Sequence, residues 1–138
     1  MLQYTDGGLR NVWLASGYEV RQTRHGKAVL IRNQEGLTKA ICLALTGKTG
    51  HLTGVEFRYI RSAGMLSSQS ALAQLIGVDT QTVARWEKSG KVPRWADKFM
   101  RLLYAAHAEG NQTVRKVVER VNLRSEEHTS ELQSRVSI

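Results

Sequence analysis

Two polar residues near the middle of the chain have side chains that suit the edges of DNA bases. Gln81 and Arg85 are four positions apart, so a helix would place them on one face. A glutamine amide can form two hydrogen bonds with adenine, and an arginine guanidinium can form two with the O6 and N7 atoms of guanine. Lys88 and Lys91 follow, and their charges would add sequence-independent attraction to phosphate. This combination indicates reading of the DNA major groove.

A less specific interpretation of the same residues stays open. Gln81 can be an ordinary solvated helix residue, and Arg85 can pair at the surface with Glu87 or Asp79. We expect Glu87 to hold a nearby arginine rather than to perform acid chemistry. Trp86 is expected to belong to the core and not to stack on a base.

Two short helical patterns must position these side chains. The first has its apolar residues on one face: Leu72, Ala73, Leu75 and Ile76. The second has Val83 and Trp86 on its apolar side. Ser68 and Asp79 can cap the two helices, and Gly77 can adopt the positive φ that ends the first one. A short connection that contains glycine then sets the two helices at a steep angle.

The full spacing of this region resembles the phage-repressor class of helix-turn-helix proteins, the Xre or Cro/cI type. The matching residues are Gln69, Leu72-Ala73, Gly77-Val78, Val83, Arg85-Trp86-Glu87 and Pro93. The resemblance implies a helical bundle in which Thr80, Gln81 and Arg85 read base edges. It also implies that Gln69 anchors the first helix to a phosphate. The expected phosphate contacts are therefore Gln69, Ser68, Lys88 and Lys91.

Composition agrees with a small binding protein. The chain has 138 residues, 41% of them hydrophobic, and a formal net charge of +8. Such a length suits one compact domain with a small appendage, and the charge favours a polyanionic partner. Basic ribosomal and membrane-surface proteins share this charge balance. No signal peptide or membrane-length apolar run is present, so we expect a cytoplasmic, nucleoid-associated protein without membrane contact.

Several kinds of chemistry find no support in the sequence. The single cysteine, Cys42, excludes an internal disulfide and a cysteine-rich zinc cluster, and its apolar surroundings predict a buried thiol. The run from Gly47 to Gly50 looks like the end of a phosphate-binding loop, but Cys42 stands where the first glycine is needed, so we interpret the run as a flexible hinge. The histidines lack ligand spacing: His25, His51 and His107. We therefore expect no catalytic site, metal or cofactor.

Residues 1–50 are expected to form a small appendage. Its predicted elements are hairpin strands over 18–23 and 28–32, a third strand over 11–14, and a short helix that ends at Gly47. The overall fold class is then mainly α, a helical bundle of phage-repressor type with an N-terminal β-hairpin.

Residues 51–110 are expected to form four helices around one core. The first begins at a capping box of Thr53 and Glu56 and ends near Gly64. The last follows Pro93, reaches about His107 and has these apolar residues: Trp95, Ala96, Phe99, Leu102, Leu103 and Ala106.

A further helix over 111–123 spaces four valines for packing on the bundle or on a second subunit: Val114, Val117, Val118 and Val121. Residues from Arg124 to Ser134 read like a translated sequencing adapter. We therefore interpret residues 124–138 as a non-native tail.

Residues 4–110 together resemble bacterial regulators related to the MqsA-like antitoxins. The segments that carry the resemblance are GLRNVWLASGYEV, HGKAVLIRNQEGL and LTGVEFRYIR. It implies an N-terminal domain that engages a toxin and a C-terminal domain that represses the operon as a dimer on a palindrome. The base-reading positions of such antitoxins fall at Gln81 and Arg85. Their zinc-binding cysteine pairs are missing, because Cys42 stands alone.

The sequence thus predicts a sequence-specific DNA-binding transcription regulator, a repressor that binds double-stranded DNA as a homodimer through a helix from Thr80 to Lys88. The alternative is an antitoxin-like protein that binds and neutralises a toxin partner and autoregulates its operon. An enzyme is a weaker alternative, since catalytic clusters are missing from the sequence. RNA binding also stays open, without an exposed aromatic platform in its favour.

Overall fold

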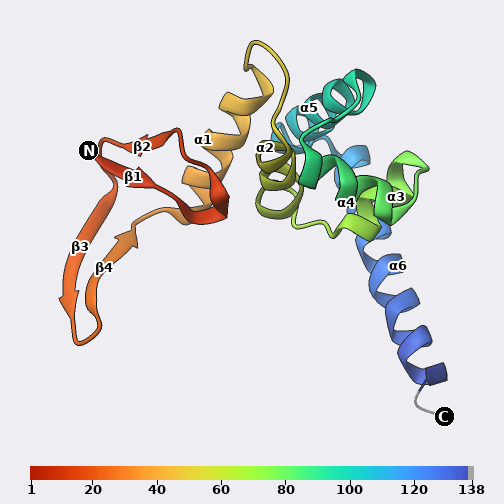
Figure 1. Ribbon diagram of the computed structural model, residues 1–138. Coiled ribbons are helices and arrows are strands. Elements are labelled where there is room, and N and C mark those ends of the chain that lie inside the picture. The colour runs from red at the N-terminus through yellow and green to blue at the C-terminus, as the bar shows by residue number, and fades with distance from the viewer. Residues whose placement is uncertain (137–138) are drawn as a thin grey trace.

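The computed structural model describes the backbone of residues 1–136 and the side chains of residues 1–124 as a mainly helical protein with β structure at its N-terminus (Figure 1). The β part contains β1 (Leu2–Tyr4), η1 (a single 3-10 turn, Asp6–Gly8), β2 (Val12–Leu14), β3 (Tyr18–Thr23) and β4 (Gly26–Ile31). The helical part contains α1 (Gln34–Thr46), α2 (Gly54–Tyr59), η2 (Ile60–Gly64), α3 (Gln69–Ile76), α4 (Thr80–Ser89), α5 (Arg94–Ala108) and α6 (Gln112–Val136). The β part lies at one end of the molecule and the far half of α6 projects at the other.

The predicted hairpin is confirmed as β3 and β4, which pair antiparallel with Tyr18 opposite Ile31 and Thr23 opposite Gly26. The turn is shorter than expected because β4 already begins at Gly26. The third strand forms as β2, but it pairs with β1 in a separate sheet that the sequence did not predict. Each of these strands has only three residues, too few for an alternating pattern to stand out. Their pairing buries Tyr4 and Leu14 in the hydrophobic core.

Helix α1 joins the core of the helical bundle. Its start is capped by the Asn33 side chain, which accepts a hydrogen bond from Gly36 N at 2.9 Å, and it ends at Gly47 as predicted. Three of its side chains are buried in the same cluster as residues of α2 and α5: Ile41, Cys42 and Leu45. The helix that we grouped with the hairpin therefore packs against α5 and η2.

The first helix of the 51–110 region has the expected start and end. The Thr53 hydroxyl accepts from Glu56 N at 3.1 Å, and a Glu56 carboxylate oxygen accepts from Thr53 N at 2.8 Å, which confirms the capping box. The helix continues from α2 into the wider π-helical turn η2 and ends at Gly64. A side chain at Gly64 would come within 2.9 Å of both Cys42 Sγ and the Tyr104 ring, so this close approach requires glycine.

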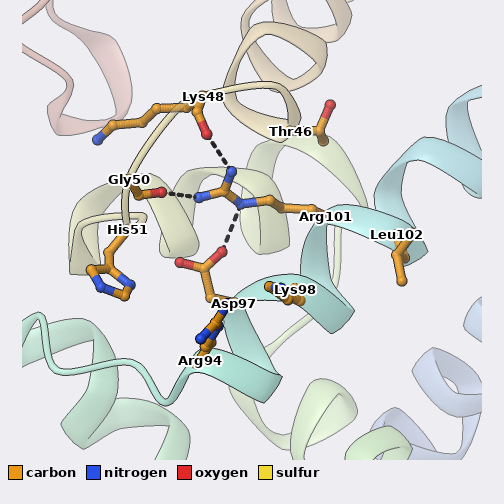
Figure 2. A pocket seen from close by; sticks show the side chains of 9 residues that line it. All are labelled: Thr46, Lys48, Gly50, His51, Arg94, Asp97, Lys98, Arg101 and Leu102. Atoms are coloured by element: carbon orange, nitrogen blue, oxygen red, sulfur yellow. Dashed lines mark hydrogen bonds and ion pairs between the residues drawn. The ribbon is translucent and has the colours of Figure 1, made fainter.

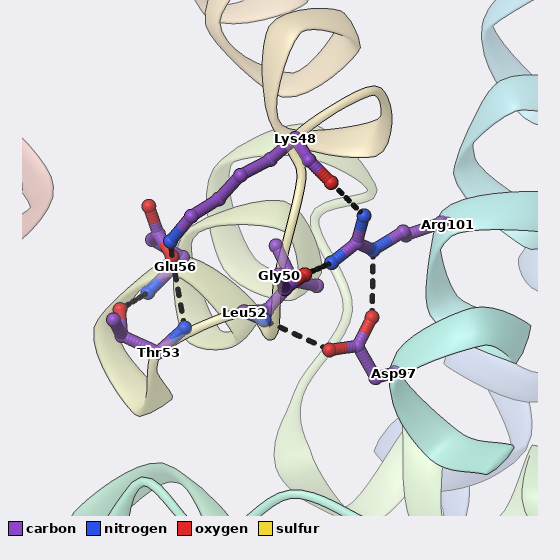
Figure 3. Close-up of polar contacts among 7 residues, drawn as sticks. All are labelled: Lys48, Gly50, Leu52, Thr53, Glu56, Asp97 and Arg101. Atoms are coloured by element: carbon purple, nitrogen blue, oxygen red, sulfur yellow. Dashed lines mark hydrogen bonds and ion pairs between the residues drawn. The ribbon is translucent and has the colours of Figure 1, made fainter. Parts of the chain in front are cut away.

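The face of α5 that enters the core differs from the predicted one. The buried residues are Ala96, Asp97, Met100 and Tyr104. The expectation was wrong for Trp95, Phe99 and Leu102, which are 51%, 38% and 72% exposed. The rotation of α5 is set by the buried Asp97 carboxylate, which accepts from Arg101 Nε at 2.6 Å (Figure 2) and from Leu52 N at 2.8 Å (Figure 3).

Helix α6 packs on α3 and α5 through the valine face that the sequence predicted. Val118 is buried, Val114 and Val121 are half-buried, and Val117 remains exposed. The backbone of α6 continues as a helix to Val136. Beyond Arg124, the stretch interpreted as a non-native tail lies outside the residues whose side chains the structure describes.

Replacing Gly54 by alanine should lower the free energy of unfolding by about 1–3 kcal/mol, the usual cost of overpacking. The added methyl group would overlap the backbone carbonyl of Glu87, which cannot move without displacing α4. Gly47→Ala is the matched control, since Gly47 has a φ of −95° and its nearest atom would lie 3.9 Å away. Urea unfolding followed by circular dichroism measures both. Equal stability of Gly54→Ala and wild type would contradict this close contact.

Cys42 should be unreactive in the folded protein. Burial raises the pKa of the Cys42 thiol from 9.0 to about 11, only partly offset by a hydrogen bond with Tyr104. At about pH 8 a disulfide reagent should therefore label the unfolded chain at once and the native chain slowly.

Because the pKa of the Cys42 thiol is higher in the folded protein than in the unfolded chain, the thiol's contribution to stability is complete below pH 9 and is lost as the pH rises through 11. Cys42→Ala should show a smaller decline of stability across that window.

Candidate nucleic-acid interface

Helices α3 and α4 are joined by a tight turn whose ends follow from local chemistry. The Ser68 hydroxyl caps α3 by accepting from Ala71 N at 3.0 Å. Gly77 ends α3 with a φ of +76°, and its N–H donates to the Ala73 carbonyl at 2.9 Å. Both features were predicted. Asp79 stands at the N-cap position of α4 but its side chain forms no capping hydrogen bond, so that expectation was wrong. The Asp79 carbonyl instead accepts from Thr82 N at 3.0 Å.

A buried ion pair holds α4 in place. Arg61 in η2 donates from Nε and a terminal nitrogen to the two carboxylate oxygens of Glu87 in α4, at 2.7 and 2.9 Å. The two side chains are only 8% and 6% exposed. The other terminal nitrogen of Arg61 donates to the Ser67 carbonyl at 2.8 Å. Glu87 therefore does hold an arginine, as expected, and that arginine is Arg61.

Gln69 belongs to the same network. Its Nε2 donates to the Glu87 carboxylate at 2.9 Å, which ties the first residue of α3 to α4. A glutamine amide has two N–H groups and one carbonyl oxygen. The contact with Glu87 accounts for one N–H, so the orientation of the Gln69 side chain is set while the rest of the amide can still meet a ligand.

The outward face of α4 carries the predicted base-reading residues. Thr80, Gln81 and Arg85 are all exposed. On the inward face Val83 is fully buried, and the Trp86 ring lies edge-on to the Phe57 ring at 6.1 Å, which confirms the expected core role of Trp86.

Arg85 forms no ion pair among the side chains of residues 1–124. The surface pair with Glu87 that the sequence left open does not form, because Arg61 occupies both oxygens of that carboxylate.

An open hollow of about 730 Å³ brings together several of the predicted phosphate contacts. It lies between α2, the start of α3 and α4, and includes Ser68, Gln69, Thr80 and Lys88 in its lining. Gln81, Arg85 and Lys91 lie outside that lining.

The hollow also contains Arg58 of α2, an exposed cation that the sequence analysis missed. The only signal for Arg58 in the sequence was a basic residue on a helix that was predicted to pack in the core. Since Glu87 is neutralised by Arg61, the charges of Arg58 and Lys88 make the hollow attractive to an anion.

The described residues give no comparable support for a metal site or a membrane span. Within the described residues no group of three or more histidine, cysteine, aspartate or glutamate side chains could hold a metal ion. No helix in that part of the chain is long and apolar enough to cross a membrane. Comparisons with known protein families, curated proteins and solved structures give no match.

Glu87→Gln should destabilise the protein by about 3–5 kcal/mol, because it leaves the Arg61 guanidinium buried without a counter-charge. The double variant Arg61→Met with Glu87→Leu removes both charges and should recover much of that loss. Urea unfolding followed by the fluorescence of Trp86 and its neighbours measures each variant. If the double variant were less stable than Glu87→Gln, hydrogen bonding to Ser67 and Gln69 would outweigh charge burial.

Proposed function

We propose that the protein is a sequence-specific DNA-binding transcription regulator, a repressor that acts as a homodimer on double-stranded DNA. In this proposal α3 and α4 form a helix-turn-helix of the phage-repressor type, and α4 from Thr80 to Lys88 enters the major groove. The observation that carries the proposal is the combination, in one helix, of an outward polar face and a buried ion pair that fixes the position of that face.

Base reading requires donors and acceptors whose positions are set before binding. Gln81 and Arg85 lie one helical turn apart on the exposed side of α4. Arg85 has no carboxylate partner among the described side chains, so its guanidinium can form both hydrogen bonds to guanine without first breaking an ion pair. Thr80, at the start of the same helix, can add a hydroxyl contact.

Phosphate contacts would set the register of the protein on DNA. The start of α3, with Ser68 and the oriented amide of Gln69, faces the hollow that Lys88 and Arg58 also line. A helix N-terminus favours a phosphate through its N–H groups and its dipole. The net charge of +8 adds long-range attraction to any DNA sequence. Lys91, just beyond α4, is exposed and can add a further phosphate contact.

A second candidate function, binding of a toxin protein, is favoured by one observation on the hairpin. Val20 and Val29 lie directly opposite each other on β3 and β4, and both are more than 40% exposed. Exposed cross-strand valines of this kind can receive a partner protein. A neighbouring gene for a small toxin, and a complex lost in Val20→Ser, would support this function.

Arg85→Ala should weaken binding to the preferred DNA site by about 1–3 kcal/mol and relax specificity at one base position per half-site. Selection from a random DNA library with wild-type protein defines that site, and Arg85→Ala is selected in parallel. Nonspecific binding should stay nearly unchanged, because base contacts contribute little to it.

Arg58→Ala is the matched control, since it also removes one exposed arginine. It should weaken all sequences about equally and reduce the slope of affinity against salt by about one counterion. A uniform loss with Arg85→Ala as well would contradict base reading. Enrichment of no sequence by the wild type would overturn the proposal.

A further inference from the structure

Three large apolar side chains form an exposed stripe along α5, which we call the α5 stripe: Trp95, Phe99 and Leu102. Their spacing of four and three residues places them on one helical face, away from the buried face of Ala96 and Met100. Tryptophan and phenylalanine are enriched in the centres of protein interfaces. The Trp95 ring forms a T-shaped pair with the Trp86 ring, with ring centroids 5.7 Å apart, so one end of the stripe contacts the core.

A basic hollow of about 630 Å³ borders this stripe, and Leu102 belongs to both (Figure 2). Its charged lining residues are Lys48, Arg94, Lys98, Arg101 and Asp97, which give an excess of three positive charges. With about 100° of rotation per helical residue, Arg94 and Lys98 fall on the same side of the stripe. The surface therefore has an apolar edge and a cationic edge.

Two of these cations already have partners (Figure 3). Lys48 Nζ lies 2.7 Å from a Glu56 carboxylate oxygen. Arg101 binds Asp97 and donates to the backbone carbonyls of Lys48 and Gly50 at 2.5 and 2.6 Å.

The loop from Gly47 to Gly50 thus turns carbonyl oxygens towards a cation, whereas a phosphate-binding loop turns its N–H groups towards an anion. Two of the three donor groups of Arg101 therefore hold this connection, which the sequence predicted to be a flexible hinge.

Arg94 and Lys98 remain available to pair with the carboxylates of a ligand. Neither forms an ion pair with any side chain of residues 1–124, and both are exposed beside the stripe. A ligand that uses the whole surface must offer apolar groups at helical spacing and negative charge along one side.

We propose that the α5 stripe with Arg94 and Lys98 is the docking surface for an acidic amphipathic helix of a partner protein. The partner's leucine-like residues cover Trp95, Phe99 and Leu102, and its carboxylates pair with the two free cations. This proposal does not rest on DNA binding, since the basic hollow beside the α5 stripe shares no lining residue with the hollow beside α4.

Charge argues against the other occupants. A second copy of this chain docked by the same patch would set cations against cations. A DNA backbone would satisfy Arg94 and Lys98 but would gain nothing from three apolar side chains. Of these three occupants, the acidic amphipathic segment is the one that uses both edges.

The test is selection of a random 16-residue peptide library on the full chain, followed by affinity measurement of the enriched peptides. Peptides with acidic residues beside leucine-like residues at helical spacing are expected. Leu102→Ser should weaken their binding at least about tenfold. The control Leu123→Ser changes another exposed leucine, on α6, and should leave binding unchanged. Lys98→Glu should also weaken peptide binding. Exchange for lysine of the single peptide carboxylate that pairs with Lys98, with the one facing Arg94 kept, should restore binding to that variant.

Three outcomes would overturn the proposal. Enriched peptides that are insensitive to Leu102→Ser and Lys98→Glu would place the binding elsewhere. A dimer of the wild-type protein that Leu102→Ser dissociates in sedimentation would make the stripe an interface between copies. A uniform loss of affinity for all DNA sequences in Lys98→Glu, without any effect on peptides, would make the cations phosphate contacts.

Discussion

The buried ion pair between Arg61 and Glu87 is the interaction on which the helical part depends. The pair joins η2 to α4. Arg61 also donates a hydrogen bond to Ser67, just before α3, and Glu87 accepts one from Gln69 in α3. A charge pair with so little solvent is stabilising only when its polar atoms have partners. Here each guanidinium nitrogen of Arg61 and each carboxylate oxygen of Glu87 takes part in at least one hydrogen bond. Because Gly54 of α2 touches the Glu87 backbone, the charge link is accompanied by close packing. The polar face of α4 is therefore presented by a helix with very little freedom to rotate.

A second polar interaction has a comparable influence on α5. Asp97 is buried because it accepts from Leu52 N and from Arg101, and Arg101 in turn holds the loop between α1 and α2. Turning Asp97 inwards places Met100 and Tyr104 in the core and leaves Trp95, Phe99 and Leu102 outside. The Asp97 carboxylate thus ties α5 to Leu52, on the face of the helix opposite the exposed apolar side chains. The same rotation brings Arg94 and Lys98 beside those side chains.

Predictions from the sequence succeeded where the deciding contact lies within a few residues. The capping box at Thr53, the Ser68 cap, the positive φ of Gly77 and the β3–β4 hairpin all depend on short-range hydrogen bonds or backbone preference. Asp79 shows the limit of such reasoning, since a capping residue type at the right position formed no side-chain cap. Strand β1 was missed because its three residues form a strand only through pairing with β2. Arg58 was missed because its neighbours in the hollow come from α3 and α4.

Residue order alone was sufficient for the spacing of Gln81 and Arg85, the places where most helices begin and end, and the inward side of α4. These follow from helical periodicity and local capping, which involve residues close along the chain. Long-range contacts were needed to choose Arg61 as the partner of Glu87, 26 positions away. Long-range contacts also chose which of two apolar faces of α5 enters the core, since both faces satisfy the same periodicity. The buried face is the one that carries Asp97, which is bonded to Leu52 45 positions earlier. Periodicity identifies a face, but burial is decided by what the rest of the fold places against it.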